Sequence, residues 1–223
     1  MSDYLTETDC SVIIPCANIY LSGILHLPDK AKGIVLFAHG SGSSRFSSRN
    51  QYIANILQQS NMATLLFDLL TAEEDKIDTH TREYRFNIEL LATRLLAASN
   101  WLLTQAILQN LPMGYFGAST GGGAALLAAA QERNHIQAVV SRGGRPDLAG
   151  SALKKVKAPT LLIVGGDDQP VILLNQQAFD ELQCIKKLTI VPGATHLFEE
   201  PGKLAEVAIL AKEWFNTYLS HRL

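Results

Sequence analysis

Residues 113–125, MGYFGASTGGGAA, place a serine between two glycines where an apolar run meets a run of small residues. The apolar run predicts a buried strand, and the small residues predict a helix that packs closely behind it. A serine on a sharp strand-to-helix turn needs very small neighbours, and Gly117 and Gly121 meet that need. Ser119 is therefore either an exposed nucleophile at the end of a strand or only the N-cap of a helix.

Short apolar runs recur along the chain, and most of them end in or directly before Gly, Asp, His or Ser. They span residues 33–38, 63–68, 113–117, 136–141, 160–165 and 187–191. Runs of this kind are typical of parallel strands that are buried on both faces. An opening segment, residues 10–27, has turn signals at Pro15 and Pro28 and predicts an antiparallel hairpin or meander.

Longer segments with helical periodicity separate these runs, at residues 52–59, 84–109, 120–133, 171–183 and 201–219. The alternation predicts an α/β fold, a mostly parallel sheet of about eight strands with helices on both faces and functional loops at the carboxyl ends of the strands. Residues 69–82, with an acidic cluster at 73–75, are expected to form an irregular surface loop.

Composition limits the function classes. Hydrophobic residues make up 47% of the 223 residues, enough for one sizeable core, so residues 1–223 are expected to form a single domain. The net charge is −2 and there is no long basic run, so we expect no nucleic-acid partner.

Localisation is predicted from the termini, the hydropathy and the cysteines. The first nine residues are acidic and polar, unlike a secretory signal, and no apolar stretch could span a bilayer. The three cysteines are an odd number. We therefore expect a reduced, cytoplasmic protein without a membrane partner, and the sequence does not predict its oligomeric state.

A nucleophilic serine needs a base, and the chain offers six histidines. His196 follows the last predicted strand and precedes the final helix, in a loop that could face Ser119. The alternative is a structural histidine in a turn, with its ring nitrogens hydrogen-bonded to backbone groups. The position of His196 after Ser119 in the chain favours the catalytic interpretation.

The histidine in turn needs a carboxylate that holds it in the right tautomer. Asp167 and Asp168 follow the strand at 160–165, between the serine and the histidine in chain order. We favour Asp168, because the second aspartate is better placed to leave the turn and reach His196. Asp167 is then free to cap the turn or the next helix.

An oxyanion formed at Ser119 needs backbone N–H donors. Thr120 offers one at the start of a helix, and the loop after residues 33–38 offers the second. Ser41 is our choice within this loop, with Gly40 as the alternative. His39 stands at the end of a strand, so a structural role that fixes the loop is expected for it.

With the elbow, the His39-Gly40 loop, the Gly166-Asp167-Asp168 turn and the His196 loop in this order, the sequence resembles the α/β-hydrolase superfamily over residues 33–219. The compact size and the turn GDDQPV, residues 166–171, are similar to the dienelactone hydrolase-like branch. The dienelactone hydrolases themselves use a cysteine nucleophile at the position that Ser119 occupies in this chain. The resemblance implies a serine hydrolase that forms an acyl-enzyme. The short connection between the strand ending at Ser141 and the strand starting at Thr160 leaves no room for the helical cap of many relatives, so we expect no cap domain and an open, shallow site.

The expected substrate is a small-molecule ester or lactone. Four arginines follow strand ends near the predicted site and are candidates for binding an anionic substrate, with pairing to nearby acids as the alternative: Arg45, Arg49, Arg142 and Arg145. No metal-ligand spacing and no nucleotide-binding fingerprint are present, so we expect no metal and no cofactor. A non-catalytic binding module and an acyltransferase with the same triad are the rival interpretations.

Overall fold

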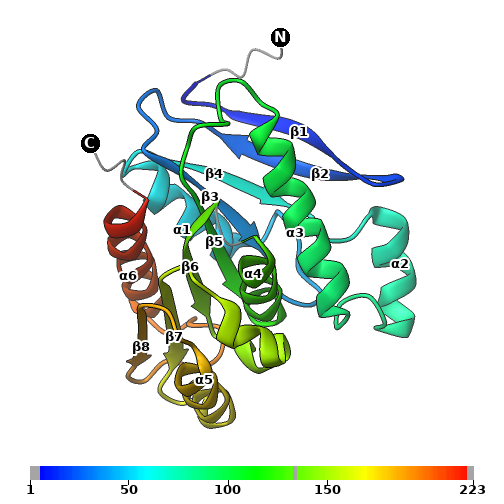
Figure 1. Ribbon diagram of the computed structural model, residues 1–223. Coiled ribbons are helices and arrows are strands. Elements are labelled where there is room, and N and C mark those ends of the chain that lie inside the picture. Colours follow the sequence, from blue (N-terminus) through cyan, green and yellow to red (C-terminus); the bar gives the residue numbers. More distant parts are fainter. Residues whose placement is uncertain (1–5, 133–134, 220–223) are drawn as a thin grey trace.

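The computed structural model describes residues 6–132 and 135–219, which form an eight-stranded sheet with helices on both faces (Figure 1). The strand order is β1-β2-β4-β3-β5-β6-β7-β8. The pairs β1–β2 and β2–β4 are antiparallel, and every other pair is parallel. The strands are β1 (Asp9–Cys16), β2 (Ile19–His26), β3 (Gly33–Ala38), β4 (Met62–Phe67), β5 (Met113–Ala118), β6 (Ile136–Arg142), β7 (Thr160–Gly165) and β8 (Lys186–Val191).

Two helices cover one face of the sheet, α1 (Ser48–Gln58) and α6 (Lys203–Tyr218). The other face carries α3 (Ile88–Leu103), α4 (Thr120–Gln131), the 3₁₀ segment η1 (Pro146–Lys155) and α5 (Gln169–Glu181). The central strands β3, β4, β5 and β7 are buried at every residue, because helices cover them from both sides. Their carboxyl ends therefore carry the loops that can reach solvent.

The predicted α/β fold is confirmed, including the opening antiparallel hairpin and the short connection between β6 and β7. Helix boundaries differ from the predicted ones by a few residues. The largest difference is at α3, which ends at Leu103 rather than residue 109. It starts at Ile88 rather than residue 84, because the Asn87 side chain accepts the N–H of Leu90 and caps the helix there. Helix α4 ends at Gln131, and the predicted last residue, Arg133, lies outside the described residues, as do residues 1–5.

The prediction of an irregular loop at residues 69–82 is wrong, because Ala72–Thr81 form helix α2. Thr71 accepts the N–H of Glu74, and Glu74 accepts the N–H of Thr71, a reciprocal capping box. Buried Asp78 accepts hydrogen bonds from the backbone of Tyr84 and Arg85 and pairs with the Arg85 side chain. Helix α2 and the turn after it are thus held as one folded unit that follows the carboxyl end of β4.

Among the residues described, none of the helices has the length and apolar character needed to cross a membrane. No disulfide joins any of the three cysteines, all of which lie in the described residues.

Candidate active site

Ser119 stands between the end of β5 and the first residue of α4, with φ of 51° and ψ of −121°. A non-glycine residue rarely takes a positive φ, so this turn is strained. Its backbone holds the strain in place: the N–H donates to the carbonyl of Arg142 (3.2 Å), and the carbonyl accepts from Gly122 and Arg145 (2.9 and 3.0 Å). The Ser119 hydroxyl makes no capping hydrogen bond to α4, so the side chain is not used as a helix cap.

Two glycines make the turn possible. A Cβ on Gly121 would lie 2.1 Å from the carbonyl oxygen of Ala38, and one on Gly117 would lie 2.5 Å from the carbonyl oxygen of Gly121. Both contacts are far closer than van der Waals distance. The glycines expected to flank the serine are therefore required by close backbone packing.

Asp168 and His196 meet although 28 residues separate them in the chain. Asp168 Oδ2 accepts a hydrogen bond from His196 Nδ1 at 2.6 Å, and the Asp168 side chain is only 13% exposed. The structure thus brings Asp168 to the histidine, whereas the backbone N–H of Asp167 donates to Ala194 and holds the His196 loop (3.0 Å). With Nδ1 engaged in this way, Nε2 of His196 is the ring nitrogen left for proton transfer.

Gly143 connects the serine turn with the histidine. It follows Arg142, whose carbonyl accepts the Ser119 N–H, and has a φ of 52°. A Cβ on Gly143 would stand 3.1 Å from the His196 carbonyl oxygen and 3.5 Å from ring atoms Nδ1 and Cε1. In the sequence, the only signal for a role of Gly143 is the glycine pair 143–144 directly after β6, and it does not reveal the contact with His196.

The predicted oxyanion residues lie together. Ser41 Oγ and Thr120 Oγ1 are 3.0 Å apart, and a Cβ on Gly40 would be 3.1 Å from the Ser119 Cβ. The loop after β3 therefore lies directly against the serine turn.

His39 holds this loop in place through hydrogen bonds of both its ring nitrogens. Its Nδ1 bonds to the carbonyl of Gly40 (3.0 Å), and its Nε2 accepts the N–H of Leu69 (3.0 Å), which assigns a neutral ring protonated at Nδ1. Burial lowers the pKa of the His39 imidazole, which keeps it neutral. Both ring nitrogens are used, so His39 acts as a structural link between β3 and β4, as expected.

Three of the four candidate arginines have acidic partners. Arg45 pairs with Asp68, Arg49 with Glu199 (2.9 Å) and Arg145 with Asp147 (2.8 Å). Arg142 is 4% exposed, and its Nη2 donates to the side chain of Asn50 (3.3 Å). Burial, together with the nearby charge of Arg49, lowers the Arg142 pKa to about 10, so the group stays charged at neutral pH.

None of these arginines has a free exposed guanidinium on an open rim, and their use in binding an anion stays a prediction. Within residues 6–132 and 135–219, no three His, Cys, Asp or Glu side chains gather as a metal site.

Comparison with known proteins shows the family to which this chain belongs. The sequence profile of the dienelactone hydrolase family matches residues 21–220, nearly the whole chain. The chain belongs to the dienelactone hydrolase family. A crystal structure of a dienelactone hydrolase from Anabaena variabilis has 60% sequence identity and a TM-score of 0.94, covering 95% of this chain and 98% of that one.

More distant structures share the fold alone. Est1E from Butyrivibrio proteoclasticus is 18% identical with a TM-score of 0.77, covering 93% of this chain and 98% of that chain. Among curated proteins, two from Mycobacterium tuberculosis, strains CDC 1551 and H37Rv, are 56% identical over 211 residues, 95% of this chain. Their name assigns them provisionally to the phosphoribosyl transferases. The match covers 47% of their length, so this chain spans about half of those relatives.

Proposed function

We propose that this dienelactone hydrolase family member is a serine hydrolase that cleaves a small ester or lactone through an acyl-enzyme at Ser119. The observation that carries the proposal is the 2.6 Å bond between Asp168 and His196, with the turn at Arg142 and Gly143 contacting both His196 and the strained Ser119 turn. A serine hydroxyl is a weak nucleophile unless a base removes its proton, and a histidine oriented by a buried carboxylate is such a base.

In the first half-reaction, Ser119 Oγ forms a bond to the acyl carbon and its proton passes to His196 Nε2. In this proposal, the N–H groups of Thr120 and Ser41 donate hydrogen bonds to the carbonyl oxygen and stabilise the negative charge that develops on it. The C–O bond to the leaving alcohol then breaks, and the alcohol takes the proton from His196. Water, deprotonated by His196, attacks the acyl-enzyme, and the acid leaves as Ser119 regains its proton.

Two rivals use the same fold. An acyltransferase would pass the acyl group to an alcohol or amine instead of water, and product analysis with competing acceptors separates it from a hydrolase. A non-catalytic binding module would need none of the triad geometry. The joint placement of Ser119, Asp168 and His196 therefore supports catalysis.

The name of the curated relatives raises phosphoribosyl transfer as another activity. Those proteins are about twice as long as the stretch they share with this chain. The name does not say which half carries phosphoribosyl transfer. The triad arrangement supports hydrolysis for the half represented here.

The experiment is hydrolysis of p-nitrophenyl acetate by the wild-type chain and by Ser119→Ala. The proposal predicts turnover by the wild type and a loss of at least about a thousandfold in kcat for Ser119→Ala. Wild-type protein that is folded but has no activity on esters, thioesters or lactones would contradict it.

A further inference from the structure

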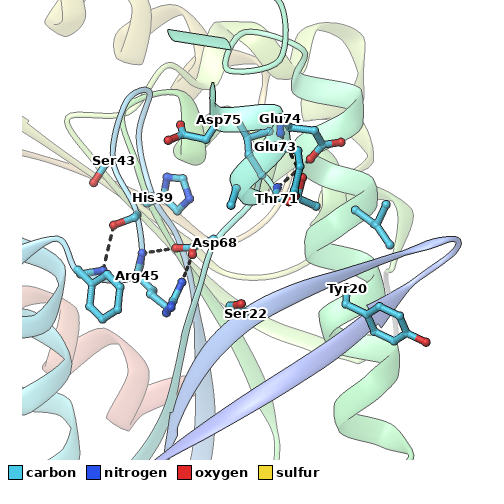
Figure 2. A pocket seen from close by; sticks show the side chains of 15 residues that line it. Tyr20, Ser22, His39, Ser43, Arg45, Asp68, Thr71, Glu73, Glu74 and Asp75 are labelled. Carbon is cyan, nitrogen blue, oxygen red and sulfur yellow. Dashed lines mark hydrogen bonds and ion pairs between the residues drawn. The ribbon is translucent and has the colours of Figure 1, made fainter. Parts of the chain in front are cut away.

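A cavity of about 800 Å³ lies next to the candidate oxyanion loop, in the size range of pockets for small ligands, about 300–1,000 Å³. Its walls come from three places: the turn end of the β1–β2 hairpin, the loop after β3, and the start of α2 (Figure 2). The residues at 69–82 that were expected to be an irregular loop thus supply one wall of this cavity.

The cavity lies near the start of α4, where Thr120 follows Ser119. A smaller hollow, lined by Gly40, Ser41 and Thr120, shares the side chains of His39, Ser43, Leu70 and Asp75 with it. Figure 2 shows Asp75 on the same side of the pocket as His39 and Ser43. This shared lining places the cavity next to the hollow at Thr120, which makes it a candidate subsite for part of a substrate held at Ser119.

The lining offers both acceptors and donors. Glu73 and Asp75, on the first turn of α2, have no ion-pair partner within the described part of the chain. The donors are the Arg45 guanidinium, one nitrogen of which pairs with Asp68, and the hydroxyls of Ser22 and Ser43. Arg45 also lies 4.3 Å from the ring centroid of Phe46, a lining residue whose side chain is 59% exposed.

This mixture selects among ligand chemistries. A simple anion would meet two unpaired carboxylates at an electrostatic cost, and a simple cation would use only the carboxylates, because the Arg45 charge is already paired with Asp68. A polyol can use the whole lining, because each hydroxyl can donate to a carboxylate and accept from a guanidinium or serine hydroxyl. An exposed aromatic ring adds an apolar surface for the C–H face of a sugar.

We propose that the cavity binds a sugar or a related polyol, so that the substrate is an ester of a sugar hydroxyl. The inference rests on the proposed function for the cleavage step only: the sugar is the alcohol that leaves when the C–O bond breaks, and it takes its proton from His196. Binding of the sugar itself needs no catalysis. The two claims can therefore be tested apart.

The test is a titration of wild-type protein with methyl β-D-glucopyranoside and methyl β-D-xylopyranoside, followed by ligand-observed NMR. The pocket variant is Glu73→Ala/Asp75→Ala, and the matched control is Asp180→Ala/Glu213→Ala, which removes two exposed carboxylates from α5 and α6. Thermal unfolding checks that both variants fold, and Glu74, which makes the α2 capping box, is untouched.

We expect the wild type and the control to bind the glycosides saturably. The affinity of the pocket variant should be at least about tenfold weaker, since each carboxylate accepts a hydrogen bond from a sugar hydroxyl. No saturable binding of either glycoside, or equal binding by the pocket variant and the wild type, would overturn the inference. Saturable binding of tetramethylammonium in place of the glycosides would also overturn it. Sugar binding without any ester cleavage would leave this inference standing and contradict the proposed function.

Discussion

Gly143 lies against the ring of His196, so that a Cβ on this glycine would be 3.5 Å from Nδ1, the atom that bonds Asp168. The preceding residue, Arg142, accepts the Ser119 N–H through its carbonyl. One short turn therefore sets the distance between the serine backbone and the histidine ring. This relationship makes the turn after β6 a part of the candidate site that a triad motif alone would not reveal.

The first prediction is that Gly143→Ala lowers kcat for ester hydrolysis by about tenfold or more, because the added methyl group displaces the His196 loop. Gly150→Ala is the matched control. Its φ of 51° is nearly that of Gly143, at 52°, but a Cβ at Gly150 meets nothing within 4 Å. Both variants should lose about 1 kcal/mol of stability from the positive φ. Equal kcat values for the two variants would show that the contact with His196 does not matter.

The second prediction separates the two aspartates. Asp168→Asn should lower kcat by about 10³ to 10⁴, because an amide cannot hold the imidazole tautomer that the base needs. Asp167→Asn should leave kcat within about twofold, since Asp167 contributes its backbone N–H to the His196 loop. The measurement is steady-state hydrolysis of one neutral ester by both variants. A larger loss for Asp167→Asn would reverse the assignment.

The third prediction concerns the elbow. Gly121→Ala should cost about 3 kcal/mol of stability or more, because the new Cβ would stand 2.1 Å from the backbone of Ala38 and neither backbone can yield easily. Urea unfolding measures the loss, with Gly150→Ala as the reference for adding a methyl group in open space. A Gly121→Ala protein as stable as the reference would mean that the helix and the oxyanion loop are farther apart than described.

The fourth prediction is a pH-dependent stability. Arg94 donates to the carboxylate of Glu74 and lowers its pKa, and the 4% exposed Arg94 would lose this partner in Glu74→Gln. A carboxyl with a lowered folded-state pKa stabilises the fold above its unfolded-state pKa, and this stability disappears as the pH falls through the folded-state value. Glu74→Gln should therefore cost about 2–3 kcal/mol at pH 7 and almost nothing near pH 2.

Urea unfolding of Glu74→Gln at the two pH values checks this, beside Glu73→Gln, whose carboxylate has no ion-pair partner in the described chain. The same loss for Glu74→Gln at both pH values would contradict the ionic origin of the effect.

A fifth prediction tests the arginines. Of the four candidates, Arg142 alone has no acidic partner in residues 6–132 and 135–219, so its buried charge favours a negative charge nearby. Arg142→Met should raise KM for an anionic ester more than for a neutral ester of the same size. Arg145→Met, which removes a guanidinium already paired with Asp147, should change the two KM values alike. An equal change in KM for the anionic and the neutral ester in Arg142→Met would contradict a role for Arg142 in binding an anionic substrate.

Much of the fold could be predicted because local signals and tertiary packing agree. Buried strands such as β3 and β7 are apolar at nearly every position, and a glycine that favours a turn ends β7 at Gly165 and follows β3 at Gly40. Helix α2 was missed because it has a single large apolar residue, Ile77, and so no helical periodicity. Its capping box, Thr71 and Glu74, was a readable signal that the acidic cluster obscured.

The candidate site was predictable to the extent that chain order implies proximity at the ends of parallel strands. Ser119, Asp168 and His196 follow β5, β7 and β8 in that order. Pairings between distant residues could not be predicted in this way. Arg49 meets Glu199 across 150 residues, and only the folded sheet brings them together.

The most direct test of the central claim is mass spectrometry of the wild-type chain after reaction with a fluorophosphonate probe. An activated serine attacks the phosphorus and displaces fluoride, leaving a covalent phosphonate on its oxygen. We predict one adduct per chain, on the peptide that contains Ser119, and none on folded Ser119→Ala. Folded wild-type protein that stays unlabelled, or an adduct that persists in Ser119→Ala, would contradict the account.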